Sequence, residues 1–229
     1  MEKMSFKNRE ELKDYISNHT IKRLGAGKDG ICSLLDNGSV CKYLYYDYNP
    51  EYALQFKDID VLSFVFATSG AYVDCYIASV FMEYADGKVL DKNKPSNIDL
   101  STLASQLDIL VSDLITISDM GILVKDFHCG NTIYDGNSFR VIDTLPYLYI
   151  PSGKYKIDNL REVMNRMYDF LLHDIMKKSI VYDKYSFYGR LDYLENPSQY
   201  LIELKTFLES LSNQSVNTLE DANMVLKKK

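Results

Sequence analysis

The chain has 229 residues, of which 46% are hydrophobic and 25% are charged, and its formal net charge is -6. These values are typical of a globular protein, long enough to form one large domain or two small lobes around a substantial core. The negative net charge argues against nucleic acid as the main partner, because duplex binding usually requires a basic surface.

The sequence also bears on the compartment. Its four cysteines include no Cys-x-x-Cys pair, which favours reduced thiols over a disulfide framework. The first residues contain no apolar run, and no stretch approaches the roughly 20 apolar residues of a membrane span. We therefore expect a cytoplasmic protein without a membrane partner. Secretion by bacteria into a host cell leaves no such mark, so the host cytoplasm stays open as a location.

The first predicted elements are a helix and a three-stranded meander. Asn8 is a capping residue for a helix over 8–18, whose apolar residues form one stripe. The turn chemistry of Asp36-Asn37-Gly38-Ser39 indicates a hairpin between the second and third strands. The three strands are expected at 21–24, 31–35 and 40–45.

A second helix and two more strands are predicted next. Asn49 followed by Pro50 is a helix start, and that helix is expected to run over 50–68. The apolar, β-branched and aromatic segment 72–84 predicts two strands that meet near Ala78.

The remainder of the chain is mostly helical. A polar connector at 88–97 marks the expected boundary between two lobes. Leucine and isoleucine at helical spacing predict a long amphipathic helix over 99–119, followed by a loop and a short hairpin up to residue 142. Three further helices are expected at 158–178, 196–212 and 217–227.

A glycine-rich segment joins the first two strands. Gly25, Gly27 and Gly30 follow the pattern Gly-x-Gly-x-x-Gly, and a strand rather than a helix comes after them. This context disfavours a dinucleotide-binding loop, in which the glycines open a helix. Glycines allow backbone N–H groups to approach a phosphate without interference from a Cβ atom. Lys42 follows on the third strand.

Two later segments carry further groups that phosphoryl transfer requires. Asp126 and Asn131 share one loop, and Asp143 follows two β-branched residues after the hairpin. Phosphoryl transfer needs a phosphate cradle, a positive anchor, a carboxylate facing the nucleophile and magnesium ligands. Asn131 and Asp143 offer oxygen ligands, which suit Mg²⁺ or Mn²⁺ rather than zinc.

In this order and spacing the segments resemble the signature set of the protein-kinase-like superfamily. The resemblance covers roughly residues 20–180. It implies an α+β, two-lobed fold within a single kinase-like domain. Residues 1–87 would form a small antiparallel-sheet N-lobe with one main helix, and residues 88–229 a reduced, mostly helical C-lobe.

The resemblance also implies a role for each motif. Gly25, Gly27 and Gly30 would cradle the phosphates of ATP, and Lys42 would bind its α- and β-phosphates. Asp126 would orient the acceptor hydroxyl and take its proton. Asn131 and Asp143 would ligate Mg²⁺.

Two assignments depend more heavily on the resemblance. Val80–Gly87 resembles the kinase hinge, with Met82 as the gatekeeper and the backbone of Glu83 and Ala85 bonded to adenine. Asp58, on the predicted second helix, takes the position of the carboxylate that pairs with the lysine, where the family has glutamate. Asp60 and Glu51 are alternatives for this pairing, and a solvated acidic helix face is the structural alternative.

Several residues depart from the family pattern. Val124-Lys125-Asp126 stands in place of His-Arg-Asp, and Asp143-Thr144-Leu145 stands in place of Asp-Phe-Gly. No Ala-Pro-Glu motif follows. We therefore expect a metal-binding loop that is less switchable than in regulated kinases.

The acceptor is the open question at this stage. His128 resembles the loop histidine of aminoglycoside- and choline-kinase-like enzymes, and would hydrogen-bond a phosphate or pack the loop. The short C-terminal part instead resembles the minimal effector kinases that bacteria inject into host cells. The sequence thus predicts a minimal atypical bacterial or viral protein serine/threonine kinase that uses ATP and Mg²⁺. The alternatives are a small-molecule phosphotransferase and a nucleotide-binding pseudokinase.

Overall fold

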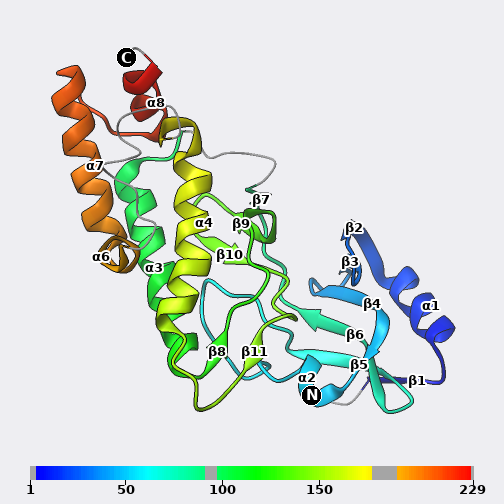
Figure 1. Ribbon diagram of the computed structural model, residues 1–229. Helices are drawn as coiled ribbons and strands as arrows, with labels where there is room; N and C mark the ends of the chain where they lie inside the picture. The colour runs from blue at the N-terminus through cyan, green and yellow to red at the C-terminus, as the bar shows by residue number, and fades with distance from the viewer. Residues whose placement is uncertain (1–3, 91–96, 177–189, 228–229) are drawn as a thin grey trace. The chain divides into compact units, whose positions relative to one another are not determined.

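The computed structural model describes residues 4–90, 97–176 and 190–227. It is an α+β protein with a mixed sheet and several helices, as expected at the coarse level (Figure 1). The chain divides into two compact units. Unit 1 comprises residues 1–85 together with 143–145, and unit 2 comprises 86–142 and 146–229.

Unit 1 is built on a six-stranded sheet in the order β1-β5-β6-β4-β3-β2. The expected meander and its hairpin turn are confirmed, and the pairing from β5 to β2 is antiparallel. At the edge, β1 pairs with β5 in parallel, so the sheet is mixed rather than wholly antiparallel. The strands are β1 (Met4–Phe6), β2 (Thr20–Ala26), β3 (Gly30–Leu35), β4 (Val40–Tyr48), β5 (Ser69–Val73) and β6 (Tyr76–Met82).

The predicted first helix is confirmed as α1 (Arg9–His19), and it covers one face of this sheet (Figure 1). The Asn8 side chain accepts hydrogen bonds from the backbone N–H groups of Glu10 and Glu11, which satisfies two donors at the helix start. Leu12 and Ile16 are one helical turn apart and buried against the sheet.

The predicted helix over 50–68 is wrong. Helix α2 (Pro50–Ala53) begins at the expected proline but ends after one turn. The chain then continues without regular helix, and its aromatic side chains form the packing: the Phe56 and Phe66 rings lie 5.3 Å apart. Aspartate and β-branched residues between 58 and 61 have low helix propensity, so burial of these rings decides the path.

The expected strand junction near Ala78 is also displaced. The turn lies at Asp74–Cys75, between β5 and β6. Ala78 is a buried residue at a register shift, where Ala71 pairs with Ser79 and Tyr72 pairs with Ile77. The position that the sequence predicted as the junction of two strands is therefore a small residue at a β-bulge within β6.

Unit 2 is a helical layer with short strands. Helices α3, α4 and α7 run side by side (Figure 1), and the predictions for 99–119, 196–212 and 217–227 are confirmed within a residue or two. Helix α4 matches the expected 158–178 up to residue 176, beyond which the end lies outside the described residues. The helices are α3 (Leu100–Asp119), α4 (Lys156–Met176), α6 (Leu191–Glu195), α7 (Pro197–Ser212) and α8 (Leu219–Lys227).

The short strands of unit 2 hold its loops in place. The predicted hairpin is confirmed, and one more strand from the connector joins it to give the order β10-β9-β7. A second, two-stranded sheet pairs β11 with β8. The elements are β7 (Lys88–Val89), β8 (Ile122–Leu123), the 3-10 turn η1 (Cys129–Asn131), β9 (Thr132–Tyr134), β10 (Phe139–Val141) and β11 (Leu148–Tyr149). Most of the remaining connector lies outside the described residues.

Helix α3 is long and apolar enough to cross a membrane by length and composition alone, with a mean hydropathy of 1.3. This differs from the expectation that no stretch has that character. Half of its most apolar window is buried inside the protein, as in the core helix of a soluble domain, so the helix is weak evidence for a membrane span.

Gly30 marks a close approach between β3 and β4. A Cβ atom at this position would lie 2.1 Å from the Tyr43 carbonyl oxygen, which no side chain tolerates. At Gly25, in β2, a Cβ atom would meet nothing within 4 Å.

We predict that Gly30→Ala lowers the free energy of unfolding by about 1–3 kcal/mol, because the two strands must separate to admit the methyl group. Gly25→Ala is the matched control and should leave this free energy unchanged or slightly higher. Urea denaturation followed by circular dichroism measures both. Equal stability of the two variants would contradict the close approach.

Candidate functional site

The predicted lysine and the predicted metal ligand form an ion pair within unit 1. The Nζ atom of Lys42 lies 2.5 Å from Oδ1 of Asp143, although the two residues are 101 positions apart. The side chain of Lys42 is only 8% exposed, whereas that of Asp143 is 33% exposed. Desolvation of an unpaired ammonium is very unfavourable, so the carboxylate stabilises the buried lysine.

The strand register explains which way Lys42 points. In β4, Cys41 and Tyr43 face α1, and the alternation of a strand sends Lys42 and Leu44 to the opposite face. Cys32 is directly across from Lys42 in the pairing of β3 with β4, so the two side chains share this face. Burial raises the pKa of the Cys32 thiol, and the charge of Lys42 partly opposes that shift.

The glycine turn leaves open backbone next to these strands. The Gly27 N–H donates to the Gly30 carbonyl at 2.9 Å, which closes the turn between β2 and β3. Cβ atoms added at Gly25 or Gly27 would meet no atom within 4 Å. Neither position is therefore glycine because of internal packing, and the missing side chains expose backbone that a ligand can approach.

The structure does not bring Asp58 to Lys42. Asp58 is exposed in the turns that follow α2, and the alternatives Asp60 and Glu51 are exposed as well. The ion pairs of Lys42 within the described ranges include none of these carboxylates. The carboxylate that sequence reasoning sought on a helix is supplied by Asp143.

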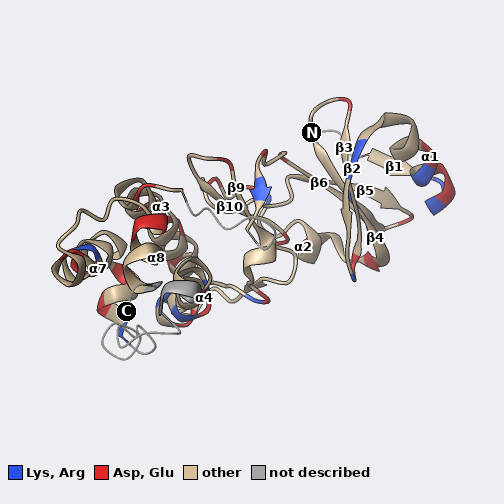
Figure 2. Ribbon diagram, turned by 90° about the horizontal axis from the view of Figure 1, so that it is seen from above, with Lys and Arg blue, Asp and Glu red and all other residues tan. Residues whose placement is uncertain are grey.

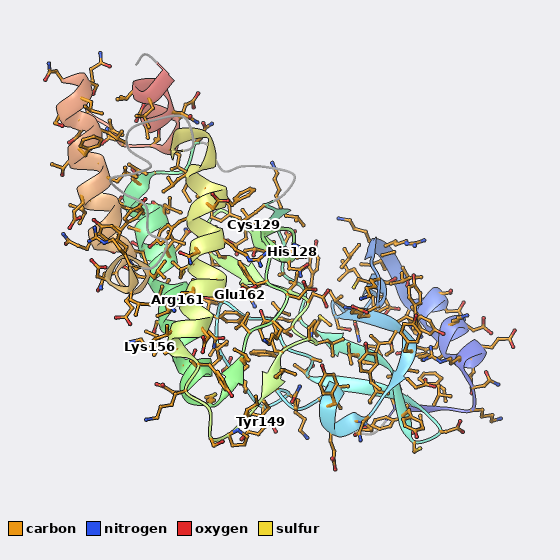
Figure 3. The ribbon with its side chains drawn as sticks, in the orientation of Figure 1. His128, Cys129, Tyr149, Lys156, Arg161 and Glu162 are labelled. Atoms are coloured by element: carbon orange, nitrogen blue, oxygen red, sulfur yellow. The ribbon has the colours of Figure 1, made fainter. Side chains whose placement is uncertain are left out.

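In unit 2, the predicted catalytic loop alternates buried and exposed residues. Val124, Phe127 and Cys129 are at most 7% exposed, whereas Asp126 and His128 are exposed. Cys129 faces α4, where its thiol contacts the Arg166 carbonyl at 3.6 Å. Figure 3 shows His128 and Cys129 together on this segment beside α4. The buried residues fix the loop, and the two polar side chains extend from it.

Three polar side chains of this loop are available to a ligand. Within the part of the chain that the structure describes, no hydrogen bond or ion pair involves the side chains of Asp126, His128 or Asn131. The backbone of Asn131 is held by its neighbours, because its N–H donates to His128 at 2.8 Å and its carbonyl accepts from Ile142 at 2.7 Å.

The predicted catalytic residue Asp126 and the predicted metal ligand Asp143 share an unusual backbone. Asp126 has φ of 55° and Asp143 has φ of 62°, in the left-handed region that residues other than glycine rarely adopt. Two other non-glycine residues in the described segments do so, Asp74 in the β5–β6 turn and Asn213 at the end of α7. Turns and helix ends account for these two. Such backbone strain concentrates at functional sites, which favours a function for the other two.

A buried asparagine that the sequence did not reveal supports the loop. Asn159 in α4 is 0% exposed. Its Oδ1 accepts from the Val124 N–H at 2.8 Å, and its Nδ2 donates to the Ile122 carbonyl at 2.8 Å and the Ser118 hydroxyl at 2.7 Å. The side chain thus binds the segment that leads into Asp126. One asparagine in a long amphipathic helix carries no local signal, so only the fold shows this role.

The predicted hinge residues follow β6. Met82 packs with Leu44 and Val80 on the sheet face that carries Lys42. Glu83 is exposed and Ala85 is buried, in an irregular segment that ends unit 1. Their predicted contact with adenine stays a prediction.

Acidic residues outnumber basic residues, 32 to 26, and the two kinds occur on the same elements. Figure 2 shows acidic and basic residues together on α1 and on α7. Among the described residues no group of three or more His, Cys, Asp or Glu side chains is arranged to hold a metal ion. Asn131 and Asp143, with one amide and one carboxylate, fall outside that kind of group.

No protein-family model matches the chain, and no curated protein is found to be similar to it.

We predict that Asn159→Ala lowers the free energy of unfolding by on the order of 3 kcal/mol, because several buried backbone and hydroxyl groups lose their partner. Asn165→Ala, on the same helix, is the control: its Oδ1 is buried without a partner among the described residues, so its loss should matter much less. Chemical denaturation compares the two. A similar loss of unfolding free energy in both variants would show that the hydrogen bonds of Asn159 do not stabilise the loop.

Proposed function

We propose that this chain is an Mg-ATP-dependent kinase with a two-lobed protein-kinase-like fold, and that it phosphorylates a serine or threonine hydroxyl of a protein. The ion pair between Lys42 and Asp143 carries the proposal. A positive phosphate anchor and a metal-binding carboxylate are the two groups that must lie close together to hold the phosphates of ATP. Here they meet on a sheet face beside open glycine backbone.

The first step in this proposal is binding of the triphosphate. Open backbone at Gly25 and Gly27 lets N–H groups approach phosphate oxygens. Lys42 releases Asp143 and donates to the α- and β-phosphates, since a phosphate group replaces the carboxylate as the counter-charge of the ammonium. Asp143 is then free to turn to a metal ion.

The donor set fits magnesium. Asn131 offers an amide oxygen without a partner in the described segments, and Asp143 offers a carboxylate, both of the hard oxygen type that Mg²⁺ prefers. When bound, Mg²⁺ neutralises charge on the phosphate oxygens. Asn131 and Asp143 would hold the ion.

Asp126 serves the acceptor. Its exposed carboxylate accepts a hydrogen bond from the hydroxyl and orients it toward the γ-phosphorus. The hydroxyl oxygen forms the new P–O bond, the bond from the γ-phosphorus to the bridging oxygen breaks, and ADP leaves. The hydroxyl proton passes to Asp126 and then to water. Positioning matters more than basicity here, because aspartate is a weak base near neutral pH.

Exposed His128 favours a second candidate, transfer to a small-molecule hydroxyl, because small-molecule kinases carry a histidine at this position of the loop. A third candidate is a pseudokinase that binds nucleotide without turnover. The direct pairing of Lys42 with Asp143 is the observation behind it, since each group neutralises the other.

We predict that the protein transfers label from γ-labelled ATP to a protein in cell lysate. Asp143→Ala and Lys42→Ala should each lower the rate on the order of 10²-fold or more, because preorganised charge is lost. Asp74→Ala is the matched control, since Asp74 has a similar positive φ of 56° in a turn. Label in the small-molecule fraction would support the second candidate. Nucleotide binding without any transfer would support the third.

We also predict that Mg-ATP protects Cys32 from alkylation, since the thiol shares a sheet face with Lys42. Exposed Cys75 is the internal control and should react at the same rate with or without nucleotide. Because burial raises the pKa of the Cys32 thiol, its thiolate fraction and labelling rate should still increase at a pH above the ordinary pKa of a thiol. Mass spectrometry of labelled peptides measures both sites. Unchanged Cys32 labelling at saturating Mg-ATP would contradict binding on this face.

A further inference from the structure

Three residues return the chain to unit 1. Asp143–Leu145 belongs to that unit, whereas the residues on either side of it belong to unit 2. Asp143 is therefore held by contacts of this short segment with the sheet and its surroundings. Its own ion pair with Lys42 is one such contact.

Thr144 makes a directional contact of this segment in addition to that ion pair. Its side chain is buried, with 6% of the residue exposed, and its Oγ1 donates to the Val65 carbonyl at 2.9 Å. Val65 is 1% exposed, within the irregular segment that follows α2. A carbonyl at this depth has no access to water, so the Thr144 hydroxyl takes the place of water as its hydrogen-bond donor.

Leu145 adds a second, non-directional contact. It packs against an apolar cluster of the same sheet face, made of Leu44, Ala53, Ala67, Ile77 and Val80. Leu44 is two residues from Lys42 on β4, so the segment is attached to the strand that carries the lysine. Apolar packing determines how deeply the segment is buried but does not fix the torsion angles of its backbone. A hydrogen bond constrains both, because it depends on direction as well as distance.

Rotation matters because Asp143 has φ of 62°. A non-glycine residue leaves the left-handed region readily unless its neighbours prevent it. The peptide bond between Asp143 and Thr144 is held from the Thr144 side by the bond to Val65. Loss of this bond would let the carboxylate turn away from Lys42.

We propose that Thr144 is the positioning residue for Asp143: its hydroxyl, bonded to the Val65 carbonyl, keeps the Asp143 carboxylate on Lys42 and ready for the metal. The inference deepens the proposed function, on which its catalytic part rests. It also gives a reason for threonine where the resemblance predicts a packed phenylalanine. In this chain the hydrogen bond from Thr144 to a buried carbonyl fixes the segment, where packing of the phenylalanine ring would fix it in the family pattern.

The test is the rate at which a trace amine-acylating reagent labels Lys42, measured by mass spectrometry without nucleotide. Thr144→Val removes the hydroxyl at nearly constant volume, and should raise the Lys42 rate several-fold, toward that of Asp143→Ala, because a carboxylate that has turned away no longer covers the amine. Asp143→Ala gives the rate of a fully unpaired Lys42. Thr144→Ser restores the hydroxyl and should return the rate close to that of the unchanged protein.

A matched control separates this contact from a general loss of threonine. Thr68→Val removes another threonine hydroxyl that donates to a backbone carbonyl in unit 1, that of Phe81 at 3.2 Å. It should leave Lys42 labelling unchanged. If Thr144→Val does not fold, as judged by thermal unfolding, Thr144→Ala takes its place. An unchanged Lys42 rate in the hydroxyl-free variant, or a Thr144→Ser variant that behaves like it, would overturn the inference.

Phosphoryl transfer gives the second measurement. The hydroxyl-free variant should lower kcat on the order of tenfold or more and raise the Mg²⁺ concentration for half-maximal rate, with Thr144→Ser close to the unchanged protein. The labelling result does not need catalysis. Absence of transfer in every variant, with labelling as expected, would refute the proposed function alone. Transfer with unaltered labelling would refute this inference alone.

Discussion

The ion pair between Lys42 and Asp143 is the interaction on which the rest of the structure depends. A lysine side chain that is 8% exposed needs a partner, and its partner comes from 101 positions further along the chain. The partner lies in a segment of three residues that belongs to unit 1, whereas the residues on either side of it belong to unit 2. The contacts of Thr144 and Leu145 make that excursion stable. The charge of Lys42 is therefore already compensated within unit 1.

The predicted catalytic loop in unit 2 differs from the ion pair in that its polar side chains are not paired with one another. In unit 2 the side chains of Asp126, His128 and Asn131 have no partner among the described residues, while the backbone around them is fixed. Buried Phe127 and Cys129 hold the loop from within, and Asn159 holds its entry. A rigid loop with free polar side chains is preorganised, so little conformational entropy is lost when a ligand orders them. Positive φ at both aspartates is consistent with positions selected for chemistry rather than for stability.

The region after α2 separates this chain from the expected pattern. Where a helix was predicted to carry the carboxylate for Lys42, buried aromatic rings of an irregular segment fill the space and leave Asp58 in solvent. Val65 in that segment provides the carbonyl that binds Thr144. The irregular segment thus keeps Asp58 away from Lys42, and it also provides the hydrogen bond to Thr144, the residue next to Asp143.

The sequence by itself determined the elements with strong local signals. Hairpin turn chemistry located the meander, Asn8 located the start of α1, and apolar periodicity located α3 and α7. It also identified Lys42 and Asp143 as functional candidates from their motifs. Only the tertiary structure decided that these two residues pair, that Asn159 and Thr144 support the loops, and that β1 joins β5 in parallel. The physical reason is that turns and helix faces are set by residues a few positions apart, whereas these contacts join distant segments and depend on how the whole core packs.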